Sequence, residues 1–267
     1  MPNGYILWEG KSLIDGTLIV AIATGFVQKS SNRKTGEMIQ TYILRQDIDP
    51  VSAVRTGGDA SICGDCPHRG TSDGQKNSGR TCYVNVWQGA LSVWKSYLAG
   101  GYPRWAASAC GRKVRLGTYG DPAAVPARVW QSLLQYSSGH TGYTHQWRAI
   151  EKDMGLSKSR FANGRIYKTL CMASVDSPEE AREAQSLGWR TFRVGRWGET
   201  ELDREGLHES LCPASAEAGK KLTCEVCLAC DGVGSGRRGS IFIPAHGGTA
   251  VMANVKKRGL NIPVRVE

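Results

Sequence analysis

The chain has 267 residues, of which 40% are hydrophobic and 22% charged, a balance that excludes a largely disordered protein. The formal net charge of +10 favours polyanions, so nucleic acid is the expected macromolecular partner, although basic residues spread evenly for solubility would give the same total. The apolar run at residues 17–24 is too short to cross a bilayer and follows no basic leader. We therefore expect no membrane partner and a cytoplasmic location.

Three strand-like runs occupy the first fifty residues, at 5–8, 17–24 and 38–45. Residues 32–36 (Asn-Arg-Lys-Thr-Gly) have the composition of a turn between the last two runs. This pattern predicts an N-terminal antiparallel β hairpin or meander as a first domain, over residues 1–58.

The second expected domain, residues 59–267, alternates between short apolar strands and amphipathic helices. Residues 177–180 (Ser-Pro-Glu-Glu) form a capping box at the start of one helix, and strands on both sides make it a β-α-β unit. The alternation predicts an α/β core with a parallel sheet, either open or curled into a partial (β/α) barrel, and functional groups at the carboxyl ends of its strands. The expected elements are a helix with an apolar face of Trp87, Ala90, Leu91, Trp94 and Leu98, a strand at 114–116, a helix at 126–136, and strands at 142–144, 166–173, 189–194 and 241–244.

A first cysteine group, Cys63, Cys66 and Cys82, reads C-x2-C-x15-C in a polar loop. A C-x2-C pair places two thiolates on one tight turn, where they can share an ion, so we interpret these residues as metal ligands. An iron–sulfur cluster is favoured and zinc is the alternative, with His68 or Cys110 as a fourth ligand that would close the site.

A second group, Cys212, Cys224, Cys227 and Cys230, reads C-x11-C-x2-C-x2-C. Its short triplet is typical of ferredoxin ligand runs, whereas zinc sites more often pair two C-x2-C knuckles, so we favour an iron–sulfur cluster here too, with zinc as the alternative. Disulfides are disfavoured for both groups because nine cysteines is an odd number and no signal peptide is expected. Cys171 is interpreted as a small buried hydrophobic residue.

Three segments together resemble radical S-adenosylmethionine enzymes that carry an auxiliary cluster. They are the thiol-rich loop ending in Cys82-Tyr83 before a helix, the turn Gly120-Asp121-Pro122 after a strand, and the second group, which begins Cys212-Pro213. The layout is also similar to that of phage-encoded cysteine-rich proteins. The cysteine segments are the specific part of this resemblance, and this chain has C-x2-C-x15-C where those enzymes have C-x3-C-x2-C.

The resemblance implies a reactive 4Fe-4S cluster on Cys63, Cys66 and Cys82, and an auxiliary cluster on the second group. It also implies binding of S-adenosylmethionine near Gly120 and Asp121, cleavage of the sulfonium by one electron, and abstraction of hydrogen from a substrate. With the basic charge, we expect that substrate to be nucleic acid or a nucleotide derivative, in the cytoplasm of the host cell if a phage encodes the protein.

Asp121 and His145 are the candidate catalytic residues. Asp121 lies where an acidic turn could accept hydrogen bonds from an amino group, although Asp before Pro is also ordinary in turns. His145 follows the strand at 142–144 and could act as an acid, a base or a phosphate contact, although a histidine at a strand end is often a surface group. The alternative function is a basic nucleic-acid-binding accessory protein without catalysis, whose metal ions fasten loops to the sheet.

Overall fold

The computed structural model describes residues 1–30, 32, 34–105, 111–154, 161, 164–195, 199, 206–215, 217–219, 222–233 and 239–258. In this part of the chain the strands form two five-stranded sheets and a two-stranded ribbon. No described helix is long and apolar enough to span a bilayer.

The first sheet begins with the predicted N-terminal meander. Strands β1 (Gly4–Lys11), β2 (Leu18–Thr24) and β3 (Ile39–Arg45) pair in antiparallel fashion, which confirms that prediction. Strands β6 (Val114–Tyr119) and β7 (His140–Thr141) then add to β3 in parallel. The sheet therefore continues across residue 58, where we expected a boundary between two domains.

The second sheet is parallel throughout. It has the order β11 (Glu209–Leu211), β12 (Ser240–Ile243), β10 (Thr191–Val194), β9 (Met172–Val175) and β8 (Tyr143–Thr144). The mostly parallel α/β core predicted from the alternation is confirmed. Strand β11 departs from this pattern, because it lies outside β12 although it comes first in the chain.

A single glycine joins the two sheets. Gly142 separates β7 from β8, and its amide donates to the carbonyl of Cys230 over 3.0 Å while its carbonyl accepts from the amide of Met172 over 3.0 Å. The parallel strands therefore lie side by side in chain order: β3, β6, then β7 continued by β8, then β9, β10 and β12. Open doubly wound sheets reverse their order at a switch point, and no such reversal occurs among these strands.

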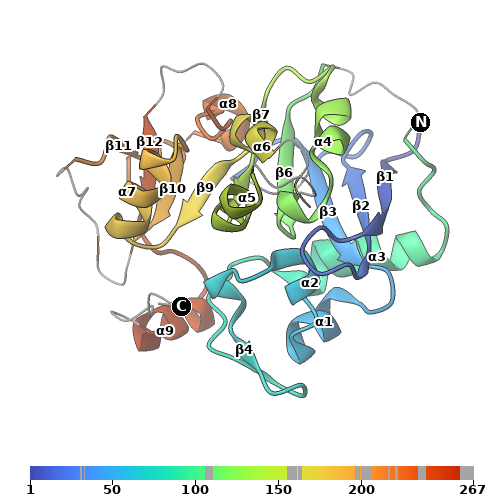
Figure 1. Cartoon of the computed structure of the whole chain (residues 1–267). Helices are drawn as coiled ribbons and strands as arrows, with labels where there is room; N and C mark the ends of the chain where they lie inside the picture. Colours follow the sequence, from blue (N-terminus) through green and yellow to red (C-terminus); the bar gives the residue numbers. More distant parts are fainter. Residues whose placement is uncertain are drawn as a thin grey trace.

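Helices cover the sheets, and further elements lie along one edge. In Figure 1, the helices α1, α2 and α9 and the short strand β4 lie below the strands of the two large sheets. The described α-helices are α1 (Pro50–Thr56), α2 (Ala60–Cys63), α3 (Leu91–Leu98), α4 (Ala127–Leu134), α5 (Trp147–Asp153), α6 (Gly164–Leu170), α7 (Pro178–Ser186), α8 (Cys224–Cys227) and α9 (Thr249–Arg258). The described part of the chain also has a π-helix, η2 (Val86–Ala90), and two 3-10 turns, η1 (Pro67–Arg69) and η3 (Pro122–Ala124). The two-stranded ribbon consists of β4 (Thr71–Ser72) and β5 (Asn77–Ser78).

Helix α7 begins as the sequence predicts. The Ser177 hydroxyl accepts a hydrogen bond from the amide of Glu180 over 3.2 Å, and Pro178 occupies the first turn. The Glu180 carboxylate accepts from the amide of Asp176 over 2.8 Å, one residue earlier than in the usual capping box. The cap thereby fixes the backbone of Asp176, directly after β9.

The apolar face predicted for the helix after Cys82 is wrong at its two ends. Trp87 is 70% exposed and Leu98 57% exposed, whereas Ala90 and Val93 are buried. The first turn is a π-helix, η2, in which each residue turns through a smaller angle than in an α-helix. The spacing of three and four residues therefore does not keep Trp87 on the buried face.

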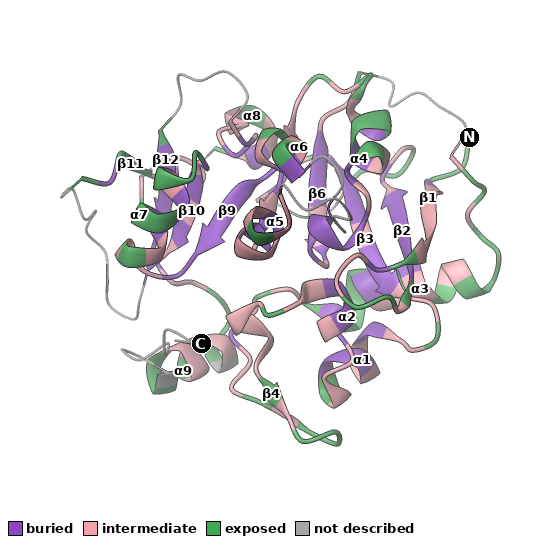
Figure 2. Ribbon diagram, viewed as in Figure 1, coloured by how far each residue is buried: buried purple, intermediate pink, exposed green. Residues whose placement is uncertain are grey.

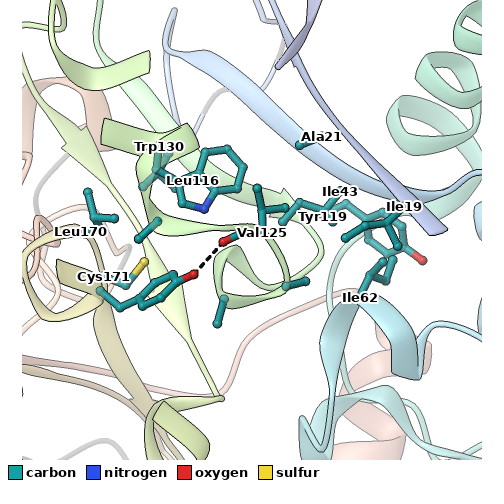
Figure 3. Close-up of a cluster of buried hydrophobic side chains, with 14 of the residues drawn as sticks. Ile19, Ala21, Ile43, Ile62, Leu116, Tyr119, Val125, Trp130, Leu170 and Cys171 are labelled. Atoms are coloured by element: carbon teal, nitrogen blue, oxygen red, sulfur yellow. Dashed lines mark hydrogen bonds between the residues drawn. The ribbon is translucent and has the colours of Figure 1, made fainter. Parts of the chain in front are cut away.

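The strand predicted at residues 166–173 is also wrong over most of its length, because residues 164–170 form α6 and only the last two belong to β9. Tyr167 and Leu170, three residues apart, both face the core, as helical spacing allows. The Tyr167 phenol donates to the carbonyl of Val125 over 2.7 Å, the dashed line in Figure 3. This contact fastens α6 to the segment before α4.

One hydrophobic core joins the meander to the parallel strands. Ile19, Ile43, Leu116 and Trp130, from β2, β3, β6 and α4, are each fully buried in it (Figure 3). Figure 2 shows the inner strands, such as β2, β3, β9 and β12, mostly buried, whereas the edge strand β1 is mostly intermediate and the helices expose part of their surface. Cys171 is buried in the same cluster, which confirms its interpretation as a hydrophobic residue.

Candidate functional site

A cavity of about 160 Å³ lies at the carboxyl ends of the parallel strands. Asp121, His145 and Ala245, just after β6, β8 and β12, line it, together with residues from the two ends of the segment 59–84. Helix α9 contributes Val255. This edge of an α/β sheet is where catalytic groups gather.

The first cysteine group converges on this cavity. Cys63, Cys66 and Cys82 all line it, together with the predicted residues Gly120 and Asp121. His145 lines it too, so the structure brings all of these site residues to one place. The part of the chain that the structure describes has eight free cysteine thiols, and Cys110 lies outside it.

A tight turn presents Cys63 and Cys66. The amide of Cys66 donates to the carbonyl of Cys63 over 3.3 Å, and Gly64 between them has φ +59°. A Cβ at Gly64 would lie 2.3 Å from the Gln146 side-chain nitrogen, so glycine is required there. That same nitrogen donates to the Cys63 carbonyl over 3.3 Å and to Asp65 over 2.7 Å, which ties the turn to the end of β8.

Backbone contacts also place Cys82. Its amide donates to the carbonyl of His68 over 2.9 Å, and its carbonyl accepts from the Arg80 guanidinium over 2.8 Å. The Asn254 side chain of α9 donates to the carbonyl of Arg80 over 2.8 Å. Cys82 is thus held close to the turn at residues 63–66, although it is far along the chain.

The three thiols influence one another's ionisation. Burial, with further contributions from Asp59 and the other two cysteines, holds the pKa of Cys63 well above its usual value. Burial also raises the pKa of Cys82. At Cys66 burial opposes ionisation, but the charges of His145 and His68 outweigh it and lower the pKa. A cation bound among the thiols would offset the cost of burying them as thiolates.

The second cysteine group converges as well, outside the cavity lining. Burial, with the nearby Cys212, Cys224 and Cys227, raises the pKa of Cys230 to about 12. The Cys212 amide donates to the carbonyl of Phe242 over 2.7 Å, and the Cys224 amide donates to that of Lys34 over 2.8 Å. Cys212 directly follows β11, Cys224 and Cys227 lie in α8, and Cys230 follows α8 beside Gly142, whose amide donates to the Cys230 carbonyl.

Arg115 and Tyr143 lie between the second cysteine group and the cavity. Both line the cavity, and the Arg115 guanidinium lies over the Tyr143 ring, 5.2 Å from its centroid. Burial opposes the charge of Arg115, but Tyr83, Tyr143 and Cys224 outweigh it and raise its pKa. Burial and the neighbouring Cys230 hold the Tyr143 pKa well above its usual value. The sequence reasoning did not identify Arg115.

The Asp121 carboxylate is already engaged by the protein. It accepts from the amide of Ala123 over 2.9 Å, the hydroxyl of Thr144 over 2.7 Å and the amide of His145 over 2.8 Å. Burial raises its pKa. Through these bonds Asp121 joins the end of β6 to the end of β8, which is a positioning role. Asp121 also lines the cavity.

Position 120 requires glycine, because its φ is +85° and a Cβ there would lie 2.7 Å from the Ile43 side chain.

We expect Gly120→Ala to lower the free energy of unfolding by about 1–3 kcal/mol, since alanine is strained at positive φ and must displace Ile43. Urea denaturation followed by circular dichroism measures this. Gly188→Ala is the control, with φ +82° but no atom within 4 Å of its Cβ, and should cost less. Equal losses would show that contact with Ile43 is not important.

His68 lines the cavity with the three cysteines, and both of its ring nitrogens lie near other side chains. Its Nδ1 lies 2.8 Å from the Thr81 hydroxyl and its Nε2 lies 2.7 Å from an Asp176 oxygen. Asp176 was not among the predicted site residues, although it directly follows β9, as His145 directly follows β8. The ligand atoms of His68, His145 and Asp176 all lie within 4.8 Å of one another.

Comparisons of this chain with protein-family models, with curated proteins and with solved structures give no match.

Proposed function

We propose that the protein is an iron–sulfur enzyme similar to the radical S-adenosylmethionine enzymes. The observation that carries this proposal is the convergence of Cys63, Cys66 and Cys82 on one cavity at the carboxyl ends of the parallel strands. Three thiolates would hold a 4Fe-4S cluster and leave one iron without a cysteine ligand. When bound, such a cluster supplies one electron to the sulfonium of S-adenosylmethionine.

The number of cysteines at the cavity favours a cluster over zinc. Structural zinc is usually held by four protein ligands, whereas three thiolates can hold a 4Fe-4S cluster. Three cysteines, Cys63, Cys66 and Cys82, line the cavity.

We assign the second cysteine group to an auxiliary cluster. Four cysteines close the coordination of a 4Fe-4S cluster, and none of these four lines the cavity. Closed coordination suits a centre that stabilises the fold and does not bind a substrate. Its thiols lie between β11, α8 and the junction of the two sheets, so a bound cluster would fasten these elements together.

We also propose that the sheet curls into a partial barrel. The parallel strands follow one another in chain order without reversal, as the strands of (β/α) barrels do. In this arrangement the residues after β6, β8 and β12 face one another across the carboxyl edge, which is consistent with their shared cavity.

A phosphate-bearing substrate, either nucleic acid or a nucleotide derivative, suits this cavity. Arg115 lines it, is only 9% exposed, and contacts no carboxylate in the part of the chain that the structure describes. A buried guanidinium is well suited to a phosphate group. The net charge of +10 would attract the same substrate from a distance.

Purification without oxygen tests this proposal. We expect a brown protein with about eight iron atoms and a similar amount of acid-labile sulfide per chain. Addition of S-adenosylmethionine and a strong reductant should release 5′-deoxyadenosine. A colourless protein with about two zinc ions per chain, and salt-sensitive binding to DNA or RNA, would instead support the accessory protein without catalysis.

A further inference from the structure

Two imidazoles and one carboxylate meet at the wall of the cavity. His68 comes from η1, His145 follows β8 and Asp176 follows β9. One ligand atom of each residue lies within 4.8 Å of the other two. Asp176 is 5% exposed, and the two imidazoles line the cavity in front of it. The three residues are brought together only by the fold.

The surrounding groups orient these side chains as they do in metal sites. The Nδ1 of His68 lies 2.8 Å from the Thr81 hydroxyl, which leaves Nε2 directed at the Asp176 carboxylate. Histidines that bind metals usually donate their other ring N–H to such a partner. The Asp176 backbone is held by the Glu180 carboxylate at the start of α7.

The Nε2 atom of His145 supplies a second, independent observation. This atom is buried and has no hydrogen-bond partner among the described residues, and it lies 3.7 Å from the second oxygen of Asp176, while Cys66 lies close to the same imidazole. A buried polar atom without a partner is costly, and most are satisfied by the protein, by water or by an ion. A metal ion between His145, His68 and Asp176 would satisfy this nitrogen.

We propose that His68, His145 and Asp176 form a binding site for a divalent transition-metal ion. Two imidazole nitrogens and one carboxylate oxygen suit iron(II) or zinc, and three protein ligands leave coordination positions open. The imidazoles line the cavity, so these positions face it, and the ion would act there as a Lewis acid on a substrate oxygen or nitrogen. The site has no cysteine among its ligands, although His145 lies beside Cys66, so metal binding here can be tested apart from the iron–sulfur proposal.

Cobalt(II) is the probe that tests this site. Protein purified without oxygen is treated with EDTA, desalted and titrated with cobalt(II) chloride, and wild type is compared with Asp176→Asn and His68→Gln. We expect wild type to bind about one cobalt ion at this site, and each variant to bind it at least about tenfold more weakly. His208→Ala, a substitution of an exposed histidine outside the site, is the control and should match wild type.

The absorption spectrum separates this site from the cysteines. The cobalt lost on substitution should show weak d–d bands without a thiolate-to-cobalt charge-transfer band, and the iron and sulfide contents of the variants should match those of wild type. Wild type that takes up no cobalt would overturn the proposal, even if the variants do not fold. Variants that bind cobalt as tightly as wild type would also overturn it. So would a thiolate-to-cobalt charge-transfer band in the part of the wild-type spectrum that the variants lose, because that band would place the lost cobalt on a cysteine.

Discussion

Replacing Cys82 by serine should remove the first of the two proposed iron–sulfur centres and leave the second. Serine has nearly the same shape but is a poor ligand for iron, so the iron content should fall from about eight to about four atoms per chain. Release of 5′-deoxyadenosine should fall to the background level. Cys82 is the informative choice because backbone contacts with His68 and Arg80 hold its position without any metal. Iron analysis and electron paramagnetic resonance of the reduced protein measure the loss.

Two further variants make this prediction specific. Cys230→Ser should remove the other half of the iron and retain the first centre, because Cys230 lies among Cys212, Cys224 and Cys227 and does not line the cavity. Cys171→Ala is the matched control, since Cys171 is fully buried in the hydrophobic core. It should keep all the iron. Loss of all the iron in both serine variants would contradict two separate centres.

The strands and their direction could be predicted because they depend on local patterns. Apolar runs, turn residues and the cap at Ser177 act within a few residues, and the meander, the strand at β6 and the β-α-β unit around α7 follow from them. The two wrong predictions, for Trp87 and for the strand at 166–173, also have causes that lie within a few residues. The π-helix η2 changes the spacing that places Trp87, and residues 166–170 are apolar enough to suit either a strand or a helix.

The site could be predicted only in part, because most of its contacts join segments far apart in the chain. The spacing predicted that Cys63, Cys66 and Cys82 share a site, and all three line one cavity, but it did not predict that Arg115 and Tyr143 line the cavity too. The meeting of His68 with Asp176 depends on which strands are neighbours. The rule that functional groups follow parallel strands identified His145, and the same rule applied to β9 would have identified Asp176.

A large loss of stability is expected from Glu209→Ala, because it removes the partner of a buried cation. The side chains of Arg193 (β10) and Glu209 (β11) are both 0% exposed, and two guanidinium nitrogens of Arg193 lie 2.9–3.1 Å from the carboxylate oxygens. The guanidinium lies over the ring of Phe242 (β12), 4.4 Å from its centroid, so the pair joins three strands. Glu199 also pairs with Arg193, and it is 25% exposed.

Alanine at position 209 should lower the free energy of unfolding by about 3 kcal/mol or more, since a buried guanidinium loses most of its compensation. Urea denaturation measures this as a lower midpoint with an unchanged slope. The control Glu183→Ala removes a 47% exposed carboxylate paired with Arg148 and should cost less than about 1 kcal/mol. In Arg193→Met with Glu209→Leu, both charges are absent, so most of the stability should return. The contrary result would be that Glu209→Ala costs no more stability than Glu183→Ala. Another group would then compensate the Arg193 charge, and the Arg193–Glu209 pair would not stabilise the contact between β10, β11 and β12.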